Sequence, residues 1–144
     1  MKIFKEQTIN CAPQKALDYI ANVQNHPAFI SSLKSIDNLK GDPKQPGAVW
    51  NWSYIMGGVQ IIGNAQTAEY EEGKRFVYKT TSGLQSTFTY EVAPDGEGTR
   101  LSITVEYDAP QSVLAKISDK AVIERLNQNE AEQAGENLKA ILES

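Results

Sequence analysis

The chain has 144 residues, 40% of them hydrophobic and 22% charged, which is typical of a globular protein with a substantial core and excludes a disordered chain. A formal net charge of -4 argues against a nucleic-acid partner, because that affinity rests on Lys and Arg neutralising phosphates. Cys11 is the only cysteine, which excludes an intrachain disulfide. With no signal peptide and no long apolar run, we expect a cytoplasmic protein without a transmembrane segment.

The N-terminal part is expected to contain one strand and two helices. Residues 2–11 are predicted to form the strand, and Pro13 then suits the first turn of a helix. The apolar residues of that helix recur at three- and four-residue spacing: Ala16, Leu17, Ile20 and Ala21. The sequence Asn25-His26-Pro27 ends this helix, and a second short helix is predicted around residues 28–33.

Between residues 35 and 107, turn residues separate segments rich in β-branched and aromatic side chains, which predicts an antiparallel meander of about six strands. Its later strands alternate, with these residues on one side: Phe76, Tyr78, Thr80, Phe88, Tyr90, Val92, Leu101, Ile103, Val105 and Tyr107. Polar residues take the other side, including Lys79, Glu91, Arg100 and Glu106. One face of the sheet is therefore predicted to be covered and the other to face water.

The stretch from Gly47 to Met56 concentrates aromatic residues on one face of a predicted strand. Trp50, Trp52 and Tyr54 alternate with smaller or polar residues. On the next strand the same face is expected to carry a row that includes small residues: Val59, Ile61, Gly63, Ala65 and Thr67. Small residues beside tryptophans leave room, so the pattern favours the wall of a pocket over a solid core.

A long C-terminal helix is expected to cover the sheet. No glycine or proline follows Pro110 until Gly135, which predicts a helix of about 30 residues, roughly 45 Å long. The middle of its apolar stripe is weak, since polar residues occupy it: Glu124, Arg125, Gln128 and Asn129. Either the helix passes over a space there or that turn faces solvent.

The sequence contains no catalytic or cofactor motif. His26 is the only histidine and, next to Pro27, is interpreted as shaping a loop; Cys11 is interpreted as a small buried hydrophobe. One histidine and one cysteine do not make a usual zinc site, and no phosphate loop or dinucleotide pattern is present. We therefore expect no metal and no cofactor.

Four segments together resemble the helix-grip, START-like superfamily (SRPBCC), and especially its bacterial polyketide cyclase and lipid-transport branch. They are INCAPQKALDYIANVQNHPAF, PGAVWNW, EVAPDGEGTRLSITVEYDAP and ENLKAILES. Each is similar to a fold signature of the family, and none is a catalytic signature. One departure is the opening of the second helix, where the family often carries an acidic residue and this chain has Gln24-Asn25-His26.

The resemblance implies an α+β fold over residues 1–144, forming a single START-like ligand-binding domain. In this helix-grip fold a curved antiparallel sheet of about seven strands surrounds a long C-terminal helix, and two short helices follow the first strand. A cavity between sheet and helix would hold the ligand. The residues expected to bind it are Phe29, near the mouth, and Trp50, Trp52, Tyr54, Ile61, Phe76, Tyr78, Phe88, Tyr90, Ile103, Tyr107, Ile117 and Ala121.

Three functions remain open from the sequence. The first is binding or transport of a small hydrophobic molecule that is lipid-, sterol- or polyketide-like. The second is a polyketide cyclase or dehydratase acting in the same cavity, with Tyr54, Tyr78, Tyr90 or Arg125 as proton donors. The third is a protein-interaction module that uses a sheet edge or a helix. The sequence does not determine the oligomeric state.

Overall fold

A curved seven-stranded antiparallel sheet forms the body of the computed structural model, which describes all residues from Met1 to Ser144. Its strands are β1 (Lys2–Ile9), β2 (Leu33–Lys40), β3 (Val49–Met56), β4 (Val59–Glu71), β5 (Arg75–Thr80), β6 (Gln85–Asp95) and β7 (Gly98–Asp108). Each strand from β2 to β7 pairs with the next along the chain, and β1 pairs with β7 at one edge. The predicted meander of six strands is confirmed, although the first strand ends at Ile9, two residues earlier than expected.

One face of the sheet is buried, as the alternation predicts. On β7, Leu101 and Ile103 are buried while Arg100 and Glu106 are exposed. The buried residues of neighbouring strands lie opposite one another, for example Tyr90 opposite Ile103. A shift of one residue would turn every apolar side chain towards water, so one-sided burial holds the register.

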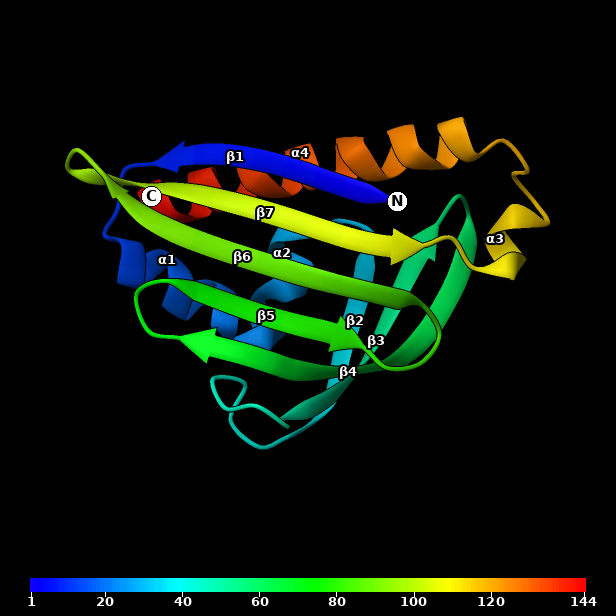
Figure 1. Cartoon of the computed structure of the whole chain (residues 1–144), viewed down its shortest axis with the longest axis horizontal. Coiled ribbons are helices and arrows are strands. Elements are labelled where there is room, and N and C mark those ends of the chain that lie inside the picture. The colour runs from blue at the N-terminus through cyan, green and yellow to red at the C-terminus, as the bar shows by residue number, and fades with distance from the viewer.

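The helices cover the buried face. They are α1 (Pro13–Ala21), the 3-10 turn η1 (Val23–Asn25), α2 (His26–Phe29), α3 (Gln111–Leu114) and α4 (Lys120–Glu143). In Figure 1, α1 and α2 lie behind the sheet, α4 runs beside β1, and α3 lies beyond the end of β7. None of them combines the length and apolar character that crossing a membrane requires.

Two helix predictions were wrong in their bounds. The second short helix spans His26–Phe29 rather than residues 28–33, because Ile30 is already extended and β2 begins at Leu33. The C-terminal helix is not continuous from residue 110, since a non-helical segment separates α3 from α4. Asp119 starts α4 by accepting a hydrogen bond from the Ala121 N–H through its side chain, at 2.9 Å. This local cap competes with continuation of the helix from α3.

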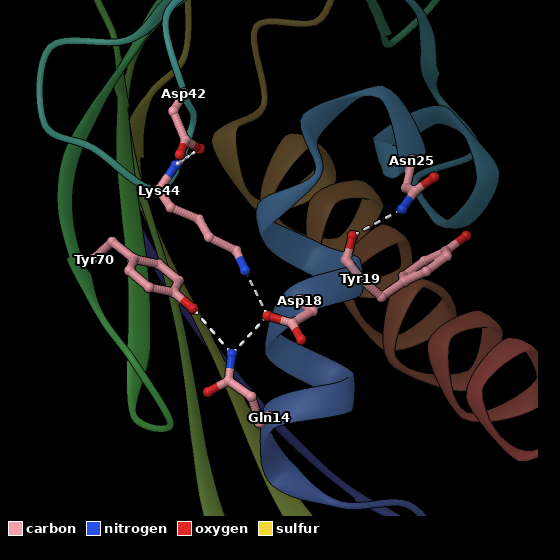
Figure 2. Close-up of polar contacts among 7 residues, drawn as sticks. All are labelled: Gln14, Asp18, Tyr19, Asn25, Asp42, Lys44 and Tyr70. Carbon is pink, nitrogen blue, oxygen red and sulfur yellow. Dashed lines mark hydrogen bonds and ion pairs between the residues drawn. The ribbon is translucent and has the colours of Figure 1, made fainter.

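A polar network ties α1 to the loop after β2 and to the end of β4 (Figure 2). Gln14 Nε2 donates to Asp18 Oδ1 at 2.6 Å and to the Tyr70 hydroxyl at 3.0 Å, and Lys44 Nζ donates to the same Asp18 oxygen at 2.6 Å. The hydrogen bond between Lys44 and Asp18 lowers the pKa of the Asp18 carboxyl and raises the pKa of the Lys44 ammonium. The network therefore anchors the long β2–β3 loop against the helix.

Candidate functional site: the cavity between the sheet and helix α4

An internal cavity lies between the buried face of the sheet and helices α2 and α4. Its lining comes from β1, β2, β3, β5, β6, β7 and both helices, with Ile30 and Leu84 from the loops between them. The lining residues are Ile3, His26, Ile30, Leu33, Ile36, Trp50, Trp52, Tyr54, Met56, Tyr78, Thr80, Leu84, Phe88, Tyr90, Ile103, Val105, Tyr107, Asn127, Glu130, Ala131 and Ala134.

The cavity is narrow. Its volume is about 80 Å³.

The composition of α4 explains why the space is left open. Where this helix passes over the sheet, its inner side carries Asn127, Glu130, Ala131 and Ala134 rather than large apolar residues. Small side chains cannot reach the sheet, so a gap remains. The polar residues of the predicted weak stretch, Glu124, Arg125, Gln128 and Asn129, do not line the cavity. Arg125 is exposed to solvent.

Stacked aromatic rings form one wall of the cavity. The rings of Tyr78 and Phe88 are nearly parallel, with centroids 4.8 Å apart and an interplanar angle of 6°. The imidazole of His26 stacks on Tyr78 at 5.4 Å, and Trp50 meets Tyr78 edge-on at 5.4 Å. Adjacent strands and α2 thus present ring faces and edges to the same space.

Trp52 contributes a polar atom that the protein does not satisfy. This side chain lines the cavity and is 5% exposed, yet its Nε1 has no hydrogen-bond partner. Its indole is held against Gly63 on β4, where a Cβ atom would lie 2.6 Å from Trp52 Cζ2. The glycine is therefore needed to accommodate this ring.

His26 joins α1 to α2 and also faces the cavity. Its ring is 1% exposed, and Nε2–H donates to Ile20 O at 2.8 Å; because a carbonyl only accepts, Nε2 carries the proton. Burial lowers the pKa of His26 to about 4, so the ring is neutral at pH 7. The interpretation of a turn-shaping histidine agrees with this bond, but no periodicity in the sequence indicated its place in the cavity wall.

The tyrosine hydroxyls of the cavity stay protonated at neutral pH. Burial raises the pKa of Tyr54, Tyr78 and Tyr90 well above the usual value. Burial also raises the pKa of Tyr107, whose hydroxyl accepts a hydrogen bond from Asn127 Nδ2 at 3.0 Å. These groups are therefore hydrogen-bonding groups at neutral pH, not bases.

Glu130 is the one acidic group of the lining, and two hydrogen bonds to a distant loop hold it. Its Oε1 accepts from the Ser32 N–H at 2.7 Å and from the Ser31 hydroxyl at 2.9 Å. These bonds attach α4 to the loop between α2 and β2. No group of three or more His, Cys, Asp or Glu side chains is arranged to hold a metal ion.

The structure brings most of the predicted ligand-binding residues to one cavity: Trp50, Trp52, Tyr54, Tyr78, Phe88, Tyr90, Ile103 and Tyr107. Phe29, Ile61 and Phe76 belong instead to the solid core, and Phe29 is fully buried rather than near a mouth. Ile117 lies in the non-helical segment against Gly57, and Ala121 is exposed at the start of α4. The last two positions follow from the break in the helix, which turns this segment away from the cavity.

Sequence reasoning missed two groups of lining residues. Ile3, Met56, Thr80 and Val105 lie on strands, and their alternation was a usable signal. The others depend on how α2, the following loops and α4 meet the sheet: His26, Ile30, Leu33, Ile36, Leu84, Asn127, Glu130, Ala131 and Ala134. Ala131 and Ala134 recur at helical spacing with Leu138, which predicts the inner side of the helix, but no local pattern marks the other positions.

Comparison with known proteins shows the family of this chain and the structures that share its fold. The family described as "Polyketide cyclase / dehydrase and lipid transport" matches residues 1–143, whereas no curated protein matches the chain by sequence. The fold is similar to that of the protein TTHA0849 from Thermus thermophilus, with a TM-score of 0.81 and 15% identity over 97% of this chain and 95% of that one.

Two further structures share the fold. Zhui aromatase/cyclase from Streptomyces sp. R1128 has a TM-score of 0.78 and 11% identity over 99% of this chain and 93% of that one. Ginseng major latex-like protein 151 from Panax ginseng has a TM-score of 0.72 and 14% identity over 99% and 97%. With the family match over residues 1–143 and the sheet-and-helix architecture described above, the chain belongs to the polyketide cyclase/dehydrase and lipid transport family, within the helix-grip START-like superfamily.

Proposed function

We propose that the protein binds or carries a small hydrophobic molecule in the cavity between the sheet and α4, with residues 1–144 acting as one binding domain. The lining is the observation that supports this, since 17 of its 21 residues are hydrophobic. Cavities walled by apolar and aromatic side chains with a few polar groups are typical of small-molecule sites. The family description, which includes lipid transport, supports a lipid-like or polyketide-like ligand.

The narrowness of the cavity favours a flat or slender ligand. The parallel faces of Tyr78 and Phe88 offer a surface on which a planar ring stacks. A bulky ligand would have to displace the wall, which costs free energy because packed interiors resist expansion.

The titration of the lining favours binding over acid–base catalysis. General acids and bases are most effective when their pKa lies near the working pH. His26, with a pKa of about 4, is a weak base, and the raised pKa of Tyr78 and Tyr90 makes them weak acids. These groups are suited to orienting a ligand through hydrogen bonds.

The alternative is a cyclase or dehydratase acting in the same cavity, and the similarity of fold to Zhui aromatase/cyclase favours it. Such an enzyme would work mainly by holding a flexible chain in a reactive conformation. Tyr54, Tyr78 and Tyr90 would then be the donors, whereas Arg125 is exposed. Replacing each tyrosine by phenylalanine should lower turnover, and unchanged turnover in all three variants would count against this function.

Tryptophan fluorescence tests the binding proposal directly, because Trp50 and Trp52 are the only tryptophans and both line the cavity. Titration with 1-aminoanthracene, a flat apolar dye, should quench their emission saturably. Ala134→Leu should fill the space and weaken binding at least tenfold. Ala140→Leu, on the exposed side of the same helix, is the matched control and should bind like the wild type.

The two variants separate binding in the cavity from binding elsewhere on the protein. If Ala134→Leu binds the dye as tightly as the wild type, the cavity is not the binding site. If the wild type quenches without saturation and binds no apolar probe, the binding proposal fails altogether.

A further inference from the structure

Among the residues that line the cavity, Trp52 is the one with a buried side-chain polar atom that has no hydrogen-bond partner, namely Nε1. Three buried side-chain polar atoms in the chain lack a hydrogen-bond partner, namely Gln14 Oε1, Trp52 Nε1 and Arg75 Nε. Only Trp52 lines the cavity. A buried donor without a partner is destabilising, and native proteins rarely keep one without a reason.

The four polar residues of the lining, in contrast, all have partners within the protein. These are His26 with Ile20, Thr80 with Leu84, Asn127 with Tyr107, and Glu130 with Ser31 and Ser32. These side chains are therefore already hydrogen-bonded within the protein. The buried indole N–H of Trp52, in contrast, has no partner within the protein.

The indole cannot readily turn to find a partner, because the backbone around it is tightly packed. Gly63 lies opposite Trp52 in the β3–β4 register, and a Cβ there would lie 2.6 Å from the ring and 2.0 Å from Ser82 O. On the other side Ile36 of β2 is paired with Trp52. The ring is thus held between two strands, and the position of its N–H is set by the fold.

We propose that the ligand carries a carbonyl oxygen on an otherwise apolar body, and that Trp52 Nε1–H donates a hydrogen bond to it. This inference rests on the proposed binding function and adds the chemical class of the ligand. An indole N–H only donates, so it selects an acceptor group. A carbonyl ligand satisfies the buried donor, whereas a pure hydrocarbon of the same shape leaves it unpaired and binds more weakly.

The test compares 9-fluorenone with fluorene, two flat tricyclic probes that differ by a carbonyl in place of a methylene group. In the wild type, fluorenone should bind more tightly even though fluorene is the more apolar of the two. Trp52→Phe should reduce the ratio of the two affinities roughly three- to tenfold, the range expected for one hydrogen bond. Ile62→Ala, an exposed position beside Gly63, is the control and should keep the wild-type ratio.

Nitrogen-15 NMR of the wild type provides a second readout that does not depend on the variant folding. The spectrum has two indole N–H signals, from Trp50 and Trp52. Fluorenone should move the Trp52 N–H proton downfield, and fluorene should not.

The outcomes separate this inference from the binding function on which it rests. If both probes bind but Trp52→Phe keeps the wild-type ratio, or if the downfield shift occurs at Trp50, the role of Trp52 is overturned and cavity binding stands. If neither probe binds the wild type, this inference is overturned; the binding function is overturned as well only if 1-aminoanthracene also fails to bind.

Discussion

Replacing Gly63 by alanine should strongly destabilise the protein. A Cβ atom at this position would lie 2.0 Å from Ser82 O and 2.6 Å from Trp52 Cζ2, whereas real Cβ contacts are essentially never shorter than 3.0 Å. The closest atom belongs to the backbone of the loop between β5 and β6, so either this loop or β4 has to move by about 1 Å, and turning a side chain would not relieve the contact. Overpacking typically costs about 1 to 3 kcal/mol, and we expect about 3 kcal/mol here.

Gly135→Ala is the matched control, since it adds the same methyl group at a buried glycine. The nearest atoms to a Cβ there are Gln7 Cβ at 3.7 Å and Ile103 Cδ1 at 4.0 Å, which are ordinary contacts. Because Gly135 lies within α4, alanine should raise the free energy of unfolding by about 0.5 to 1 kcal/mol.

Urea and thermal denaturation followed by circular dichroism measure both effects. For a chain of this size, the loss in Gly63→Ala corresponds to a melting temperature lower by roughly 10 °C. Unfolding free energies for Gly63→Ala within about 1 kcal/mol of the wild type would refute the reasoning, because the strands would then have room that the structure does not show.

Three further changes test other parts of the structure. Burial lowers the pKa of His26 to about 4 in the folded protein, whereas its unfolded pKa is near 6.5. Its contribution to stability is therefore complete above pH 6.5. As the pH falls from 6.5 to 4, the free energy of unfolding should drop by up to about 1.4 kcal/mol per pH unit. Urea titrations should show a flatter pH profile for His26→Gln, and an equal slope would contradict this assignment. Lys44→Met should lower the free energy of unfolding by no more than about 1 kcal/mol, because the side chains of Lys44 and Asp18 are 38% and 50% exposed. A decrease of more than about 2 kcal/mol would show that the network is more than a surface ion pair. Asp119→Ala should lower the unfolding free energy by about 1 kcal/mol through loss of the cap to Ala121, with Asp119→Asn close to the wild type; equal losses in the two variants would rule out capping.

Half of the cavity wall was predictable because strands reveal their buried face locally. Trp50, Tyr78, Tyr90 and Ile103 were placed on one face by alternation alone, and all are buried there. Alternation survives in the sequence because one-sided burial acts on every second residue of a strand.

The other half of the wall was not predictable, because it depends on contacts between distant parts of the chain. Glu130 on α4 is held by Ser31 and Ser32, almost a hundred residues earlier. His26, the first residue of α2, faces the cavity because its ring donates a hydrogen bond to Ile20 O and stacks on Tyr78 of β5. Neither contact leaves a periodic signal in the sequence.

The sequence by itself determined the strands, their covered face and the scarcity of large apolar residues in the C-terminal helix, since these are properties of neighbouring residues. Only the tertiary structure decided where the helix breaks, which rings meet, and that Trp52 Nε1 remains without a partner. The physical reason is that a cavity forms where two packed surfaces do not fill the space between them, and a donor is unsatisfied when neither surface offers an acceptor. Both properties depend on two surfaces together, and the local sequence describes only one of them.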